Sequence, residues 1–184
     1  ESCTISDIHA YRPSKHSLSQ SQILLRNYTA DEARLPMREM VESLVLELLQ
    51  IKAVTKCIHV HIGYAAEDLK STGGSRTLAH YTDSFQELCP AVLSLFDKYK
   101  RPHELIRRIA VSFEELVNKS AVPTEMDLFS DALDETEEKE EHIQQAMLNI
   151  KGRFGKNAIL RASSLQEEGT MQFRNTLVGG HNGE

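Results

Sequence analysis

The spacing of apolar residues switches between a strand period and a helix period in a fixed order along residues 16–118, and this order restricts the possible folds. Segment 55–65 alternates, with apolar side chains at Ile58, Val60, Ile62 and Tyr64 and with Cys57, His59 and His61 between them. Alternation with a period of two is typical of a strand that buries one face. Segments 16–28, 75–81 and 105–116 are also predicted as strands, and Gly73-Gly74 predicts a turn before the third.

Two segments show helical spacing instead. Thr29 and Glu32 form a capping box, which predicts a helix start. The apolar stripe that follows consists of Met37, Met40, Val41, Leu44, Leu48 and Ile51, and Pro36 lies inside this helix. Asp83 with Gln86 predicts the start of a second helix, whose stripe is Phe85, Leu88, Val92, Leu95 or Phe96, and Tyr99.

The order β-α-β-β-α-β predicts an α+β fold. A four-stranded, mainly antiparallel sheet would be covered on one face by the two helices, as in a split βαβ arrangement. The other face of the sheet would remain polar. A C-terminal helical extension would follow this domain.

The chain divides into four regions. Residues 1–15 and 119–133 are predicted linkers, each with a proline, and residues 16–118 form the domain. Residues 134–184 form the extension, with a charged helix over 134–153, a turn at 155–157, a short strand over 158–162 and a flexible end from Gly179. The apolar positions expected to anchor the helix are Ile143, Met147 (or Ala146) and Ile150.

Charge is unevenly distributed between these regions. Residues 1–119 contain 15 basic and 15 acidic residues, whereas residues 120–184 contain 6 and 12, so the net charge of −6 arises in the C-terminal part. A neutral domain can still present a basic surface to nucleic acid. No apolar run approaches the ~20 residues that span a membrane. The three scattered cysteines predict neither a disulfide framework nor a zinc site, so we expect a cytoplasmic protein.

Basic and hydroxyl residues occur together on the predicted strands. No acidic residue lies between Lys70 and Thr82 or between Leu105 and Phe113. Arginine and hydroxyl groups on a strand surface suit phosphate oxygens. A solvated sheet face, or ion pairs within the protein, is the alternative.

Four motifs in order resemble the little finger domain of Y-family translesion DNA polymerases, in the UmuC/ImpB/MucB/SamB branch. They are Lys15-His16-Ser17-Leu18-Ser19, Gln22 to Thr29, Ser75-Arg76-Thr77-Leu78 and Ile106 to Phe113, and the resemblance spans roughly residues 8–118. Ala110 replaces the usual glycine, and Pro36 is not expected in the family.

The resemblance implies a domain that grips duplex primer–template DNA through phosphates, beside a catalytic core to which residues 1–15 would lead. It implies a role in DNA damage tolerance and the SOS response. The implied DNA-binding residues are Lys15, Ser17, Ser75, Arg76, Thr77, Arg107 and Arg108.

Segment 125–129 resembles the clamp-binding pentapeptide of such polymerases. Its residues are Glu125, Met126, Asp127, Leu128 and Phe129, with a glutamate where the motif has glutamine. Leu128 and Phe129 would fill an apolar pocket of the bacterial sliding clamp. The alternative is an apolar patch that covers the core.

Polymerase chemistry is not expected from these residues alone. Ser112-Phe113-Glu114-Glu115 is similar to part of the family's catalytic loop, but two-metal phosphoryl transfer needs converging carboxylates, and neighbouring Glu114 and Glu115 would diverge. We therefore expect no catalytic residue and no cofactor here, and Mg²⁺ only in the parent polymerase. His59-x-His61 lacks a third metal ligand at a suitable spacing, so no metal is expected.

A stand-alone module that binds protein or RNA remains the alternative function. RNA-binding sheets of this topology usually display stacking aromatic side chains on the open face. The predicted open face has few aromatic residues, which favours the duplex DNA hypothesis.

Overall fold

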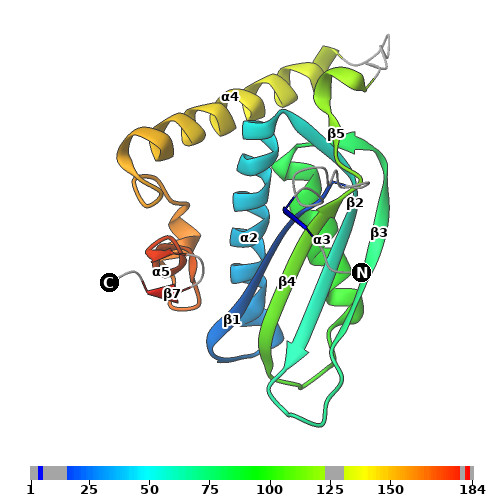
Figure 1. The fold of residues 1–184 in the computed structure, drawn as a ribbon, viewed down its shortest axis with the longest axis vertical. Coiled ribbons are helices and arrows are strands. Elements are labelled where there is room, and N and C mark those ends of the chain that lie inside the picture. The colour runs from blue at the N-terminus through cyan, green and yellow to red at the C-terminus, as the bar shows by residue number, and fades with distance from the viewer. Residues whose placement is uncertain (1–3, 6–15, 123–130, 179–180, 183–184) are drawn as a thin grey trace.

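Two long helices lie on one face of an antiparallel sheet (Figure 1). The computed structural model describes residues 4–5, 16–122, 131–178 and 181–182. The sheet order is β1 (Leu18–Tyr28), β4 (Ile106–Glu114), β2 (Ala53–Tyr64) and β3 (Thr72–Thr82). The helices are α2 (Ala30–Ile51) and α3 (Phe85–Tyr99). The predicted α+β fold and its βαββαβ order are confirmed.

The capping box at the start of α2 is also confirmed. The Thr29 hydroxyl accepts a hydrogen bond from the Glu32 amide, and the Glu32 carboxylate accepts one from the Thr29 amide at 2.6 Å. Arg26 pairs with the same carboxylate at 2.8 Å, and this contact, together with the hydrogen bonds from Thr29, lowers the pKa of Glu32 to about 2. The helix then continues through Pro36.

The core lies between the helices and the sheet. The α2 stripe is buried as expected, except that Ile51, the last residue of the helix, is half exposed. These side chains and those of α3 pack on β2 and β4, and a fully buried Leu, Ile or Phe contributes about 1.5–3 kcal/mol. The largest buried core residues of these elements are Met37, Met40, Leu44, Leu48, Ile58, Ile62, Leu88, Phe96, Ile106 and Phe113.

The start of α3 differs from the prediction by one residue. Ser84, not Asp83, is the N-cap, and its hydroxyl accepts a hydrogen bond from the Glu87 amide at 3.3 Å. Asp83 instead forms an ion pair with Lys119 at 3.0 Å. The preceding Thr82 hydroxyl accepts from the Ser84 amide.

The predicted turn at Gly73-Gly74 is wrong, because both glycines lie inside β3. A Cβ atom at position 73 would lie 2.2 Å from the backbone oxygen of Val60, and one at position 74 would lie 2.4 Å from the Tyr99 ring. These glycines therefore allow the close approach of β3 to β2 and α3.

The C-terminal region folds back on the domain. It contains α4 (Asp131–Phe154), η2 (Ala162–Leu165), α5 (Met171–Arg174), and β6 (Leu177–Val178) paired with β7 (His181–Asn182). Before it, β5 (Val117–Asn118) pairs with the start of β2, and η1 (Lys119–Ala121) follows.

Several details of this region differ from the sequence prediction. The helix begins at Asp131, inside the predicted linker, and the expected strand over 158–162 is wrong, since the backbone there forms bends and enters η2. The pairing of β6 with β7 brings part of the expected flexible end into a hairpin. Ile143 is exposed, whereas Glu140 and Gln144 are buried with Met147.

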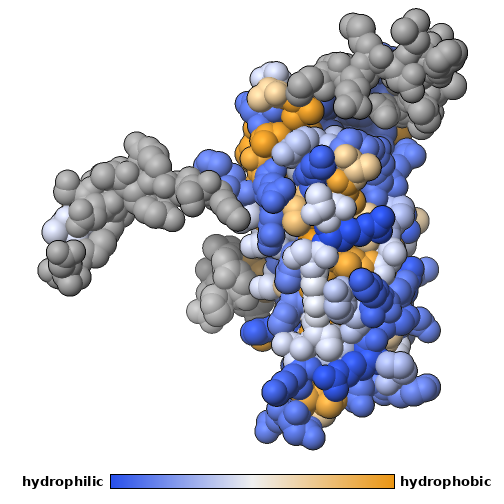
Figure 2. All heavy atoms as spheres, turned by 90° about the vertical axis from the view of Figure 1, so that its right-hand side faces the viewer, coloured by the Kyte–Doolittle hydropathy of each residue, from blue (hydrophilic) through white to orange (hydrophobic). Residues whose placement is uncertain are grey.

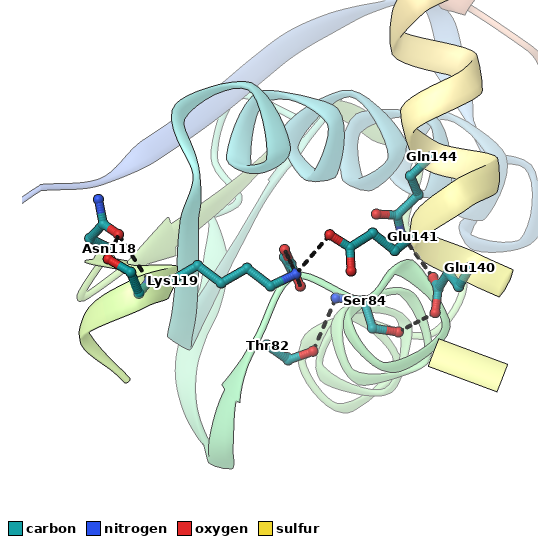
Figure 3. A network of polar contacts seen from close by, with 9 residues as sticks. Thr82, Ser84, Asn118, Lys119, Glu140, Glu141 and Gln144 are labelled. Atoms are coloured by element: carbon teal, nitrogen blue, oxygen red, sulfur yellow. Dashed lines mark hydrogen bonds and ion pairs between the residues drawn. The ribbon is translucent and has the colours of Figure 1, made fainter. Parts of the chain in front are cut away.

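Polar contacts explain why Glu140 is buried (Figure 3). Its carboxylate accepts hydrogen bonds from the Ser84 hydroxyl at 2.6 Å and the Gln86 amide at 3.0 Å, so it binds the amino end of α3. The helix dipole favours an acceptor charge at this position. Lys119 bridges Asp83 and Glu141 beside it. These contacts attach α4 to the domain.

A second set of contacts attaches the end of the chain to α2. The buried Glu39 carboxylate accepts hydrogen bonds from the Thr170 amide, the Thr170 hydroxyl and the Met171 amide at 2.8–3.0 Å. Glu42, one turn further along α2, pairs with Arg161, whose guanidinium lies 4.3 Å from the Phe85 ring centre. The extension is thus held by buried charges of α2. None of the helices in the described ranges is long and apolar enough to cross a membrane.

Candidate nucleic-acid interface

The face of the sheet that the helices leave uncovered, here called the open face, is built by strand alternation. Ile58, Val60 and Ile62 point to the helices, so His59, His61 and Gly63 point away from them. Residues paired directly across antiparallel strands share a face. The pairing then places these residues on the open face: Ser19, Ser21 and Ile23 of β1; Arg108, Ala110, Ser112 and Glu114 of β4; and Gly73, Ser75 and Thr77 of β3.

Hydroxyl and imidazole groups form a row across all four strands. Ser19 pairs with Ser112, Ser112 with His59, and His59 with Ser75. The His59 Nδ1 atom lies 3.0 Å from the Ser75 hydroxyl oxygen. A parallel row contains Ser21, Ala110, His61 and Gly73. Apart from the two histidines, the side chains in these rows are those of serine, alanine and glycine, which are short and leave the sheet surface accessible.

A β-bulge positions the two neighbouring arginines. Tyr64 pairs with Ile106 and Gly63 with Arg108, which leaves Arg107 as an extra residue in β4. Both arginines are consequently exposed, although Ile106 and Ile109 on either side are fully buried. Without the bulge, strict alternation would direct one arginine into the helix side.

Arg107 and Arg108 have different surroundings. Arg107 donates a hydrogen bond to the Leu24 carbonyl at 2.7 Å, where β1 separates from β4. Arg108 lies opposite Gly63, where an added Cβ would lie 3.1 Å from the Cβ of Arg108. Gly63 therefore makes room for the stem of Arg108 on the open face.

Arg76 lies on the other side of the sheet from its neighbours. It pairs with Ile58, which faces the helices, while Ser75 and Thr77 pair with open-face positions His59 and Cys57. Arg76 is exposed because β3 is the edge strand. The sequence prediction grouped all three residues on one surface, and the structure brings only Ser75 and Thr77 together with the open face.

The remaining predicted residues are either exposed or outside the residues that the structure describes. Ser17 is exposed immediately before β1. Lys15 and the peptide Glu125-Met126-Asp127-Leu128-Phe129 lie outside the described residues. The sequence prediction did not include Ser19, Ser21 and Gly63 among the site residues, because their place on the open face depends on strand register. Alternation along segment 16–28 could have indicated the two serines.

The open face carries few charges. Within the part of β1–β4 that the structure describes, Arg108 and Glu114 point to this side, and Arg107 is exposed at the bulge. The Ser112 hydroxyl donates to the Glu114 carboxylate at 3.3 Å. The described residues contain no group of three or more His, Cys, Asp or Glu arranged to hold a metal ion.

The surface seen from the β3 side is mostly polar. Figure 2 shows hydrophilic residues along this side, with residues of intermediate hydropathy down its middle and apolar areas interrupted by polar ones. The arrangement suits a polar ligand held by many weak donors. Hydroxyl, imidazole and guanidinium groups are the donors that bind phosphate oxygens in nucleic-acid complexes.

A family model described as the impB/mucB/samB family C-terminal domain matches residues 15–128. The chain is 30% identical over 169 residues to a putative UV-damage repair protein UvrX of Bacillus subtilis, covering 90% of this chain and 38% of that protein. It is 32% identical over 125 residues to a DNA polymerase IV of Bacillus velezensis, covering 67% of this chain and 29% of the relative.

The chain therefore spans about a third of the length of the curated relatives it matches. Among solved structures, an insertion ternary complex of Dbh DNA polymerase has a TM-score of 0.46 and 18% identity. That match covers 60% of this chain and 33% of the other. This similarity is too low to add to the family match.

Proposed function

Because the chain belongs to the impB/mucB/samB family of C-terminal domains, we propose that it is the non-catalytic DNA-binding and clamp-docking part of an error-prone translesion DNA polymerase. The observation that supports DNA binding most is the open face, where hydroxyl groups, imidazole groups and Arg108 from four strands form one polar surface. This surface would contact the phosphates of a primer–template duplex. Such contacts position a protein on DNA without reading its sequence.

The composition of the open face favours a duplex over single-stranded RNA. Sheets that bind single strands stack bases on aromatic side chains. The open-face positions of β1–β4 assigned above include no Phe, Tyr or Trp. Without stacking platforms, affinity must come from the backbone of the nucleic acid.

In the parent polymerase this domain would hold DNA while a separate catalytic core with Mg²⁺ performs nucleotide transfer. Residues 1–15 would lead from that core, and DNA damage tolerance, including the SOS response, would be the setting. The relatives named as a UV-damage repair protein and as DNA polymerase IV support this proposal. Ser17, Lys15 and Arg76, the last on the edge strand β3, would add further phosphate contacts.

Clamp docking rests on segment 125–129. Leu128 and Phe129 would enter an apolar pocket of the bacterial sliding clamp, and the acidic Glu125 and Asp127 would remain at its rim. Tethering to the clamp raises the local concentration of the polymerase at the primer end. Duplex grip and clamp docking would thus add to one another.

Removal of Arg108 tests the DNA-binding surface. The Arg108→Ala variant should bind a labelled duplex more weakly, and the slope of log affinity against log salt should decrease by about one, because one phosphate contact is lost. Fluorescence anisotropy over a salt series measures both quantities. Arg107→Ala should act similarly, but it also removes the hydrogen bond to Leu24, so its thermal stability must be measured alongside.

Arg153→Ala is the matched control. Arg153 is exposed on α4, away from the sheet, and its substitution removes the same charge from the molecule. It should leave affinity and salt slope close to those of the unchanged protein. Equal losses in Arg108→Ala and Arg153→Ala would show that binding follows overall charge and would contradict the assigned surface.

A further inference from the structure

Two histidines lie in the middle of the open face. His59 and His61 are on β2, which is flanked by β4 on one side and β3 on the other, and both side chains are partly exposed. The Nδ1 atom of His59 contacts the Ser75 hydroxyl at 3.0 Å, which leaves its Nε2 atom available for a second partner. A protonated imidazole has a donor on each nitrogen. In that state His59 can donate to Ser75 and to a ligand simultaneously.

The groups that face these histidines provide almost no net charge. From β4, Arg108 lies two residues beyond the partner of His61, and Glu114 lies two residues beyond the partner of His59. From β3 the facing groups are Gly73, Ser75 and Thr77, and from β1, beyond β4, they are Ser19, Ser21 and Ile23. On β2 itself the other titratable groups are Cys57, the buried Tyr64, and Lys56, whose ammonium lies 5.5 Å from the Tyr81 ring centre. Arg107 is directed to the Leu24 carbonyl at the bulge.

The opposite charges of Arg108 and Glu114 therefore cancel around the two imidazoles. A phosphodiester placed on this surface would bring negative charge next to neutral hydroxyl groups and next to side chains that can gain a proton. Histidine is the side chain whose charge ordinarily changes between about pH 5 and pH 8. A nearby anion favours the charged form of an imidazole.

We propose that His59 and His61 bind duplex phosphates as imidazolium ions, so that DNA binding by the open face takes up protons. This inference rests on the proposed DNA-binding function. The two histidines would thereby supply positive charge at the centre of the sheet, where the charges of Arg108 and Glu114 offset each other. The ligand class is the phosphodiester backbone, whatever its base sequence.

Proton uptake predicts a defined dependence on pH. Affinity for a labelled duplex at constant salt should rise as pH falls from about 8 to about 6, and each linked proton adds at most about one to the slope of log affinity against pH. We expect a total gain of roughly tenfold, since linkage is partial over this range. The double variant His59→Gln, His61→Gln should lose the gain in affinity at low pH.

His142→Gln is the matched control, because His142 is exposed on α4, which packs on the helix side. It should keep the full dependence on pH. Calorimetry in two buffers with different ionisation enthalpies, at one pH, counts the protons directly. The unchanged protein should take up protons on binding, and the double variant should not.

Different results separate this inference from the proposed function. Duplex binding that is independent of pH, or that keeps its pH dependence in the double variant, would overturn the role of the histidines while leaving the DNA-binding surface intact. Absence of duplex binding at both pH values would overturn the proposed function itself. Thermal unfolding of each variant at both pH values ensures that folded protein is compared.

Discussion

At the scale of single residues, the two glycines of the third strand show how packing decides what a position tolerates. Gly73→Ala should destabilise the protein by about 1–3 kcal/mol, because its Cβ would meet the Val60 backbone oxygen at 2.2 Å and the strands must separate. Gly152→Ala is the control: nothing lies within 4 Å of its added Cβ, and alanine in a helix should stabilise by about 0.5–1 kcal/mol. Chemical denaturation of both variants measures the two free energies of unfolding. Equal stability of Gly73→Ala and the unchanged protein would contradict the close approach of β3 to β2.

Residues also show where sequence reasoning stops. The periodic spacing of apolar residues and the helix-capping motifs predicted both helices, all four strands and the Thr29 capping box, because these signals are local in sequence. The turn expected at Gly73-Gly74 failed because a glycine pair signals either a turn or a close contact, and only the position of Val60 and Tyr99 decides between them. The side occupied by Arg76 and the extra residue Arg107 depend on strand register and a bulge, which are set by partners distant in sequence.

At the scale of elements, the extension is held to the domain by carboxylates of helix α2 and by those of α4. An apolar stripe was expected to anchor α4, but Ile143 is exposed and the buried Glu140 binds the amino end of α3. A local pattern cannot show this, since an acidic residue is normally assigned to the solvent side. Burial of a carboxylate becomes favourable only where several donors converge on it.

Glu39→Gln tests this mode of attachment. Replacement of the carboxylate weakens three charge-assisted hydrogen bonds from Thr170 and Met171, so we expect a loss of about 1.5–3 kcal/mol and faster proteolysis of the chain after α4. Glu47→Gln, on the same helix, is the control: its carboxylate accepts a bond from Gln20 and is only partly buried, so the loss should stay below about 1 kcal/mol. Similar stability of the two variants would show that the extension is attached by other contacts.

At the scale of the whole molecule, the helices and the extension occupy one side and the open face the other (Figure 1). The proposed clamp peptide, segment 125–129, lies outside the described residues and outside the open-face strands, so we expect its substitution to leave duplex binding intact. Leu128→Ala with Phe129→Ala should abolish binding to a bacterial sliding clamp in surface plasmon resonance, because the apolar anchors are removed. Duplex affinity and melting temperature should change little. A large fall in melting temperature would instead support the apolar patch that covers the core.

The junctions on either side of residues 123–130 give this peptide an unusual setting. Before it, the Lys119 amide donates to the Lys52 carbonyl and the Lys119 side chain pairs with Asp83. After it, Glu141 and Glu140 of α4 bind Lys119 and Ser84. Described residues on both sides of segment 123–130 are therefore attached to the same part of the domain, next to the start of α3. If segment 125–129 binds a sliding clamp as proposed, the chain would be anchored to the domain on both sides of the bound peptide, and the entropy of closing that connection would already be lost in the folded protein.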